Sequence, residues 1–143
     1  MKTYVASLNN LREMLQFIKD NATEAKFSES EILKIELAVE EALVNIINYG
    51  YPNVLGEISL QCTINKNEGM RIVIKDESIP YNPLTNPKIF NPKSPLESGD
   101  VGGYGIFFIL KIMDEVKYDR YNEFNILTLT KYADDRSGAD NNY

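Results

Sequence analysis

Three polar side chains lie along one line of a largely apolar stretch of the chain, LAVEEALVNIINYG, at residues 37–50. Glu41 and Asn45 are spaced i and i+4, so on a helix their side chains can meet one ligand, and Asn48 continues the same line. A carboxylate and an amide oxygen are hard ligands that Mg²⁺ accepts. Apolar residues flank the line on both sides, so it is either the rim of a second helix contact or the wall of a cleft over the core.

A second acidic group ends a predicted strand. In MRIVIKDESIPYNP, residues 70–83, Asp76 shares parity with Met70, Ile72 and Ile74, so it extends the row of side chains that should face the helices. A buried carboxylate needs a hydrogen-bond donor. Asp76 is therefore either an acid in the turn after the strand or an acceptor for the amine of a ligand.

Glycines gather before a predicted helix, in the segment GDVGGYGIFFILKIM at residues 99–113. They let the backbone approach a ligand closely, and free N–H groups at a helix N-terminus favour phosphate. The glycines are Gly99, Gly102, Gly103 and Gly105. A glycine-rich turn alone is weak evidence, but this one follows a long proline-rich segment, which favours a binding loop.

Composition excludes several kinds of function. The chain has 143 residues and no histidine, which rules out a Ser-His-Asp hydrolase, a histidine-ligated zinc site and a phosphohistidine on this chain. The net charge of -6 argues against nucleic acid as a partner. No apolar run is long enough to span a bilayer, and the start lacks a secretory pattern. We expect a cytoplasmic protein, with Cys62 unable to form an internal disulfide.

Hydrophobic periodicity predicts one α+β domain over residues 1–133. Helices are predicted at 9–24, 28–50 and 102–113, with Ser28 as the N-cap of the second and the third buried on most sides. Strands are predicted at 2–7, 56–64, 70–76, 114–120 and 124–132. This order predicts a two-layer sandwich, with helices on one face of a mixed or antiparallel sheet. Residues 82–101 are predicted to form a lid, and residues 134–143 a disordered tail.

Three of these segments stand in a fixed order: EEALVN at 40–45, DESIPYNP at 76–83 and GGYGIFFILKIMDEVKY at 102–118. Together they resemble the motifs of the GHKL, or Bergerat-type, ATP-binding fold, which histidine kinases share. More narrowly, the chain resembles the stand-alone anti-sigma-factor serine-protein kinases of bacterial partner-switching systems, the RsbW and SpoIIAB kind. The likeness covers nearly the whole chain.

The resemblance implies a role for each matching residue. Glu41 would be the general base, Asn45 would coordinate Mg²⁺ that bridges the phosphates, and Asn48 would assist there. Asp76 would accept the amino group of adenine. The tail of that motif matches at Pro80, Tyr81, Asn82 and Pro83, and the phosphate-facing backbone matches at Gly103 and Gly105, with Gly102 adjacent.

Two positions depart from the family pattern. Ser78 stands where relatives carry a glycine that lets the base approach closely, so nucleotide binding is expected to survive in a weakened form. Tyr49 stands where relatives commonly carry histidine. The resemblance implies ATP or ADP with Mg²⁺ as cofactors and a STAS-domain anti-anti-sigma protein as phosphorylation target. It also implies a sigma factor as a second partner, and a homodimer.

Three alternatives remain open from the sequence. Ser78 also suits a nucleotide-gated binding regulator without kinase activity. An interaction domain with an empty pocket requires that the polar line and the glycines be structural accidents. A histidine kinase catalytic domain would need its dimerisation helices and acceptor histidine on another chain.

Overall fold

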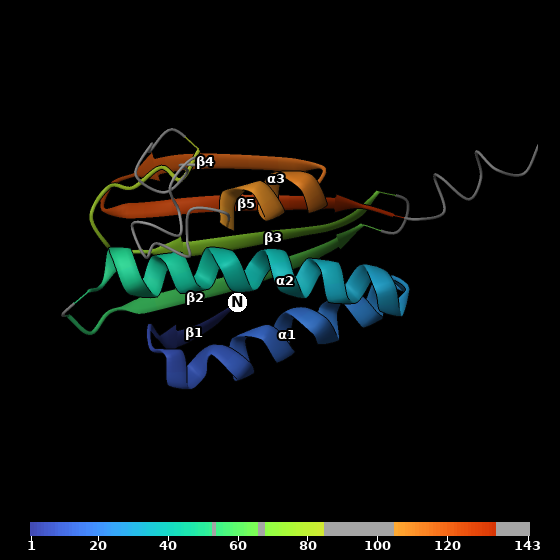
Figure 1. Cartoon of the computed structure of the whole chain (residues 1–143), viewed down its shortest axis with the longest axis horizontal. Coiled ribbons are helices and arrows are strands. Elements are labelled where there is room, and N and C mark those ends of the chain that lie inside the picture. Colours follow the sequence, from blue (N-terminus) through green and yellow to red (C-terminus); the bar gives the residue numbers. More distant parts are fainter. Residues whose placement is uncertain (53, 66–67, 85–104, 134–143) are drawn as a thin grey trace, which may run out of the picture.

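The computed structural model describes residues 1–52, 54–65, 68–84 and 105–133. Three helices cover one face of a five-stranded sheet (Figure 1). The helices are α1 (Leu11–Glu24), α2 (Glu29–Asn45) and α3 (Gly105–Ile112), and the strands are β1 (Lys2–Val5), β2 (Glu57–Asn65), β3 (Gly69–Asp76), β4 (Glu115–Tyr121) and β5 (Phe124–Tyr132). A 3-10 helix, Leu8–Asn10, precedes α1, and a π-helical turn, Ile46–Gly50, follows α2. The α+β prediction is thereby confirmed.

The strand order is β1-β2-β3-β5-β4, and every pairing is antiparallel. The sheet within the described residues is therefore antiparallel throughout rather than mixed. The central strands β2, β3 and β5 alternate buried and exposed side chains. Their inward rows include Leu60, Ile72, Ile74 and Leu129, each fully buried, as expected for a sheet with one covered face.

Helix α2 lies between α1 and α3 across the sheet (Figure 1). It starts where the sequence predicts, because the Ser28 side chain accepts a hydrogen bond from the Glu31 backbone N–H at 3.2 Å. Its regular part ends at Asn45, where the predicted helix would continue to Gly50. The last turn is π-helical instead, and it closes with a bond from Tyr51 N–H to the Ile46 carbonyl.

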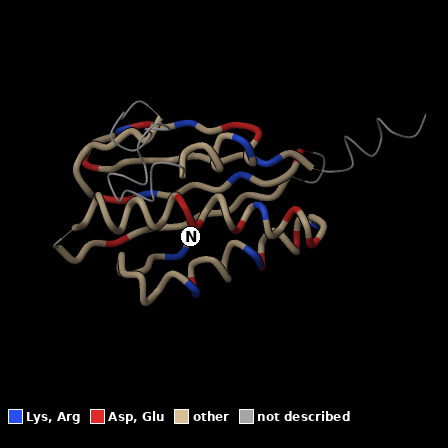
Figure 2. The backbone as a smooth tube through the Cα atoms, viewed as in Figure 1, with Lys and Arg blue, Asp and Glu red and all other residues tan. Residues whose placement is uncertain are grey.

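Charge is absent from the last turns of α2. After Glu40 and Glu41, residues 42–50 carry no charged side chain, and Figure 2 shows this half of the helix without red or blue. Its buried positions are instead apolar, apart from Asn45: Ala42, Leu43, Ile46 and Ile47 contribute to the core. An amide in such surroundings needs a structural or functional explanation.

One sequence prediction about an apolar surface is wrong. Helix α3 is not buried on most sides, because Phe107, Phe108 and Leu110 are 45%, 42% and 51% exposed, while only its other face packs into the core. Apolar composition does not reveal which face of a helix a neighbouring element covers. On α2, the apolar flank of the polar line that contains Leu33 makes no helix contact at that residue, which is 63% exposed.

Other predictions fall on residues that the structure does not describe. These are most of the lid (85–101), the tail (134–143) and the start of the third helix (102–104). Within the described residues, no helix is long and apolar enough to cross a membrane.

Candidate nucleotide site

Glu41, Asn45 and Gly105 meet where α2 contacts the N-terminus of α3. A Cβ atom placed on Gly105 would lie 3.0 Å from Glu41 Oε2 and 3.3 Å from Asn45 Nδ2. Any larger residue at position 105 would therefore press on both side chains. Three of the residues that the sequence assigns to the phosphate site are thus adjacent in space.

Asn45 is 4% exposed, and its amide nitrogen has no hydrogen-bond partner within the described part of the chain. A buried donor without a partner costs about 1–3 kcal/mol. Such a group is expected where a ligand or ion completes its bonding. The same amide also carries an oxygen suited to Mg²⁺, so this site fits the metal that the resemblance implies.

Glu41 lies one helical turn before Asn45 and is partly buried. Burial first, and then the negative charge of Glu40, raise the pKa of Glu41 above its ordinary value. A carboxylate with a raised pKa is a stronger proton acceptor once ionised. No group of three or more His, Cys, Asp or Glu side chains that could hold a metal occurs among the described residues. A bound Mg²⁺ would therefore rely on few protein ligands, as it often does beside phosphates.

Asn48 does not join this group. It lies in the π-helical turn and is exposed, whereas Asn45 is buried. The π turn changes the angular step between residues, so a line drawn for a regular helix does not hold beyond Asn45. Gly102 and Gly103 lie outside the described residues.

Asp76 ends β3 on the helix-facing side, and it is only 3% exposed. Its Oδ1 atom accepts hydrogen bonds from Ser78 N–H at 2.9 Å, Ser78 Oγ at 2.5 Å and Asn125 Nδ2 at 3.0 Å. The bond to Ser78 N–H is the turn contact that one interpretation of the sequence expected. Asp76 also faces inward and is buried, as an acceptor for the amine of a ligand would be. The turn contact and the proposed acceptor role are therefore compatible.

Ser78, at the family's glycine position, fits because another glycine makes room. Ser78 is buried, and a Cβ atom on Gly50 would lie 2.7 Å from Ser78 Oγ and 2.8 Å from Ser78 Cβ. In the sequence, Gly50 is the position where the predicted second helix ends. In the structure it also allows the π-helical turn to pack against the Ser78 side chain.

Asn125 of β5 is a site residue that sequence reasoning missed. It is 4% exposed and lies directly opposite Asp76 in the sheet register. Its amide nitrogen also donates to Ser78 Oγ and the Ile79 carbonyl, and its oxygen accepts from Tyr118 OH and Tyr81 N–H. In FNILTLTKY, Asn125 shares parity with Leu127 and Leu129, so the signal that singled out Asp76 was present here too.

A pocket runs between these two groups of residues. Its walls come from α2 and the π-helical turn, from α3, from β3, β4 and β5, and from the segment after β3: Ala42, Asn45, Ile46, Asp76, Ser78, Tyr81, Pro83, Ile109, Tyr118, Asn125 and Leu127. It holds about 400 Å³ of atom-free space including its open mouth. Apolar walls with one acid among them are the lining that a flat ring bearing an amino group requires.

Comparison with known proteins finds a matching family and several relatives. Residues 4–131 match the model of the histidine kinase-like ATPase domain. The serine-protein kinase RsbW of Oceanobacillus iheyensis is 33% identical over 113 residues, covering 74% of this chain and 68% of that protein. The RsbW of Listeria monocytogenes is 27% identical over 124 residues, covering 84% and 78%.

Among solved structures, the chain is similar to the nucleotide-free catalytic domain of histidine kinase ThkA. The identity is 14% and the TM-score 0.47, over 90% of this chain and 94% of that chain. The family match spans most of the sequence and includes both ends of the pocket. The chain therefore belongs to the histidine kinase-like ATPase domain family, and within it resembles the RsbW serine-protein kinases.

Proposed function

We propose that this protein is an ATP-dependent serine-protein kinase that regulates a bacterial partner-switching system. The observation that carries the proposal is the contact of Glu41, the unpartnered Asn45 amide and the Gly105 backbone near one end of a pocket whose other end is Asp76. In this arrangement Asp76 can bind the adenine ring, and Asn45 and the Gly105 backbone can bind phosphates. Glu41, where α2 contacts α3, can accept a proton.

In this mechanism Asp76 accepts a hydrogen bond from the adenine amino group, and the apolar pocket walls enclose the ring. Asn45 would hold Mg²⁺, which would neutralise charge on the phosphates. Glu41 takes the proton of the substrate serine as the serine oxygen attacks the γ-phosphorus. The bond from that phosphorus to the bridging oxygen breaks, so the products are a phosphoserine and ADP.

The proposed substrate and partners are those that the family resemblance implies. The similar proteins are named serine-protein kinases. We propose that the substrate serine lies on a STAS-domain antagonist, that a sigma factor is a second partner, and that the protein acts as a cytoplasmic homodimer.

A nucleotide-gated regulator without kinase activity is the second candidate. The observation that favours it is the Ser78 hydroxyl, which lies in the pocket and bonds to Asp76, the proposed adenine acceptor. This version would bind ATP or ADP and change partners without transferring phosphate.

Phosphate transfer from labelled ATP to the STAS protein encoded nearest to this chain's gene separates the two candidates. We expect Glu41→Gln to lower the transfer rate by about 10²–10⁴-fold while nucleotide affinity is retained. Glu40→Gln is the matched control, because it makes the same change at the preceding residue, which does not contact Gly105 in the described structure. Phosphate transfer at the full rate by Glu41→Gln would refute the role of Glu41 as general base. No transfer by the unmodified protein would favour the nucleotide-gated regulator without kinase activity.

Calorimetry tests the placement of the nucleotide. We expect ATP and ADP to bind more tightly with Mg²⁺ present, and Asp76→Asn to weaken both by about tenfold or more, because a charged acceptor is replaced by a neutral one. Equal affinities in the variant and the unmodified protein would show that adenine is not bound at Asp76.

A further inference from the structure

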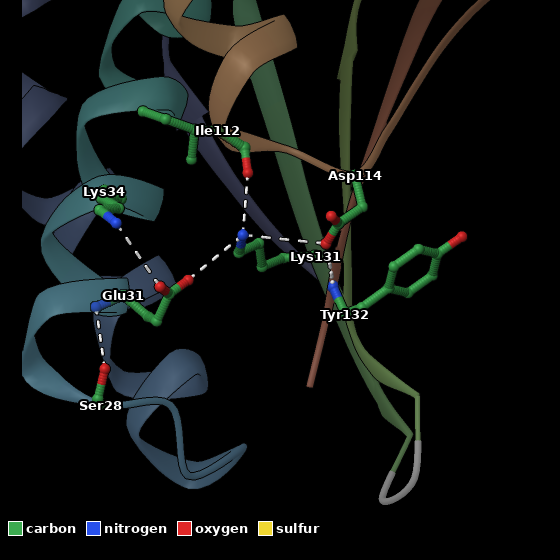
Figure 3. Close-up of polar contacts among 7 residues, drawn as sticks. All are labelled: Ser28, Glu31, Lys34, Ile112, Asp114, Lys131 and Tyr132. Atoms are coloured by element: carbon green, nitrogen blue, oxygen red, sulfur yellow. Dashed lines mark hydrogen bonds and ion pairs between the residues drawn. The ribbon is translucent and has the colours of Figure 1, made fainter. Parts of the chain in front are cut away.

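Lys131 of β5 holds the C-terminal end of α3. Its Nζ atom donates a hydrogen bond to the carbonyl of Ile112, the last residue of α3, at 3.0 Å (Figure 3). The last carbonyls of a helix lack partners within the helix, and a cation stabilises that end. The Lys131 side chain is only 16% exposed, on the row of β5 that faces the helices.

Two carboxylates complete this cluster. Lys131 Nζ lies 3.3 Å from Glu31 Oε2 in the first turn of α2 and 3.9 Å from Asp114 Oδ2 just before β4 (Figure 3). Asp114 Oδ2 also accepts a hydrogen bond from Tyr132 N–H at 2.6 Å. A partly buried charge with several fixed partners has one favourable position, so the cluster ties α3 to α2 and to the sheet.

Helix α3 connects this cluster to the proposed phosphate site. It has eight residues, so it is about 12 Å long, and a helix this short is stable only when other elements hold it. At its other end Gly105 lies against Glu41 and Asn45. Ile106 and Ile109 bury the inner face of α3. Apolar packing limits sideways movement, whereas the bond from Lys131 fixes the position of α3 along its axis.

We propose that Lys131 is a positioning residue for the phosphate end of the nucleotide site. It sets the distance of Gly105 from Glu41 and Asn45 by holding the far end of α3. This inference rests on the proposed function, because it assumes that phosphates bind beside Gly105. Lys131 itself does not line the pocket that leads to Asp76.

Lys131→Met tests the proposal, because methionine keeps much of the apolar stem and removes the charge. We expect ATP affinity to fall on the order of tenfold, since small misplacements at a reacting centre have effects of this size or larger. Adenosine, which has no phosphates, should bind within about twofold of the unmodified protein. Lys131→Arg should restore part of the ATP affinity. Calorimetry measures the affinities of the unmodified protein and of each variant for both ligands.

Lys34→Met is the matched control. Lys34 Nζ lies 3.8 Å from Glu31 Oε1, but its side chain is 57% exposed, and no bond from it to α3 occurs among the described residues. We expect its ratio of ATP to adenosine affinity to stay unchanged. If Lys131→Met does not fold, as judged by circular dichroism, Glu31→Gln replaces it, and the same change in ratio is expected at smaller size.

The outcomes separate the two proposals. An unchanged ratio of ATP to adenosine affinity in the folded Lys131 or Glu31 variant would overturn the positioning role and leave the nucleotide site intact. Failure of the unmodified protein to bind ATP would overturn the nucleotide site, and the positioning role with it. A selective loss of ATP affinity that Lys131→Arg reverses would support both.

Discussion

The two ends of the pocket differ in how far the protein itself satisfies their buried polar groups. The base end is the part of the pocket at Asp76, where the adenine base is proposed to bind. There Asp76 Oδ1 accepts three hydrogen bonds, and Asn125 bonds through both its nitrogen and its oxygen. At the phosphate end, Asn45 is equally buried, yet its nitrogen has no partner in the described part of the chain. Within the described residues, asparagine thus bonds through both amide atoms at one end and has an amide nitrogen without a partner at the other.

This difference indicates a division of roles between stability and function. A complete network of buried polar groups stabilises a fold and fixes side-chain directions. An incomplete one costs stability, and it persists where a ligand completes it. The base end therefore has its hydrogen bonds without a ligand, whereas we propose that a ligand completes those of the phosphate end. Matched substitutions at the two ends test this comparison.

The largest effect is expected from Asn125→Leu. Leucine has a similar volume but cannot bond, so Asp76 loses one donor, and Tyr118 OH and Tyr81 N–H lose their acceptor. We expect the free energy of unfolding to fall by about 2–4 kcal/mol, measured by urea denaturation. Asn9→Leu is the control, because Asn9 is exposed and should change stability by less than about 0.5 kcal/mol. Equal effects of the two variants would mean that the network does not stabilise the fold.

A smaller loss is expected from Gly50→Ala, again at the base end. The added methyl group would lie within 2.8 Å of the Ser78 side chain, so we expect a loss of about 1–3 kcal/mol from overpacking. Ser78→Gly in the same chain should recover most of that loss, because it removes the atoms that clash. A double-mutant cycle in urea measures the coupling. Additive effects would contradict the close packing of Gly50 against Ser78.

Asn45→Leu makes the change of the first prediction at the phosphate end, and the expected result is different. Because it removes an amide nitrogen without a partner, the free energy of unfolding should stay within about 0.5 kcal/mol or rise. The affinity for ATP with Mg²⁺ should instead fall about tenfold, as measured by calorimetry. A loss of stability as large as that of Asn125→Leu would show that the two ends do not differ.

The same two ends show how far the sequence could predict this structure. Alternation along MRIVIKD placed Asp76 inward, and the i, i+4 spacing placed Glu41 beside Asn45, because both patterns depend only on regular local geometry. The π-helical turn that begins at Ile46 and contains the exposed Asn48 could not be predicted, because no spacing rule signals it. The exposed face of α3 was missed because burial depends on what covers a helix, and not on its own composition.

Asn125 was missed for a different reason. Its inward parity can be read from FNILTLTKY, but its importance comes from the register that places it opposite Asp76, and register is a long-range property. Gly50 is similar, because its contact with Ser78 joins segments 28 residues apart along the chain. The sequence therefore predicted which residues of the candidate site face inward or lie one helical turn apart, while the contacts that support them required the fold.

The smallest effect concerns the charge of Glu41 at the phosphate end. Burial raises the pKa of Glu41 in the folded state above its value in the unfolded chain, so the folded state binds this proton more tightly. The contribution of Glu41 to stability is therefore fully present below the unfolded pKa, and it is lost as the pH rises through the folded pKa. Glu41→Gln removes that dependence, so the difference in unfolding free energy between the variant and the unmodified protein should change across this window. Urea denaturation at a series of pH values from 4 upward, in steps of about 0.5, measures it. Glu24→Gln is the control, because Glu24 is exposed at the end of α1 and the change leaves Glu40 and Glu41 untouched. A curve for the Glu41 variant parallel to that of the unmodified protein would mean that the Glu41 carboxylate is as well solvated when folded as when unfolded, and the contrast between the two ends of the pocket would then rest on Asn45 alone.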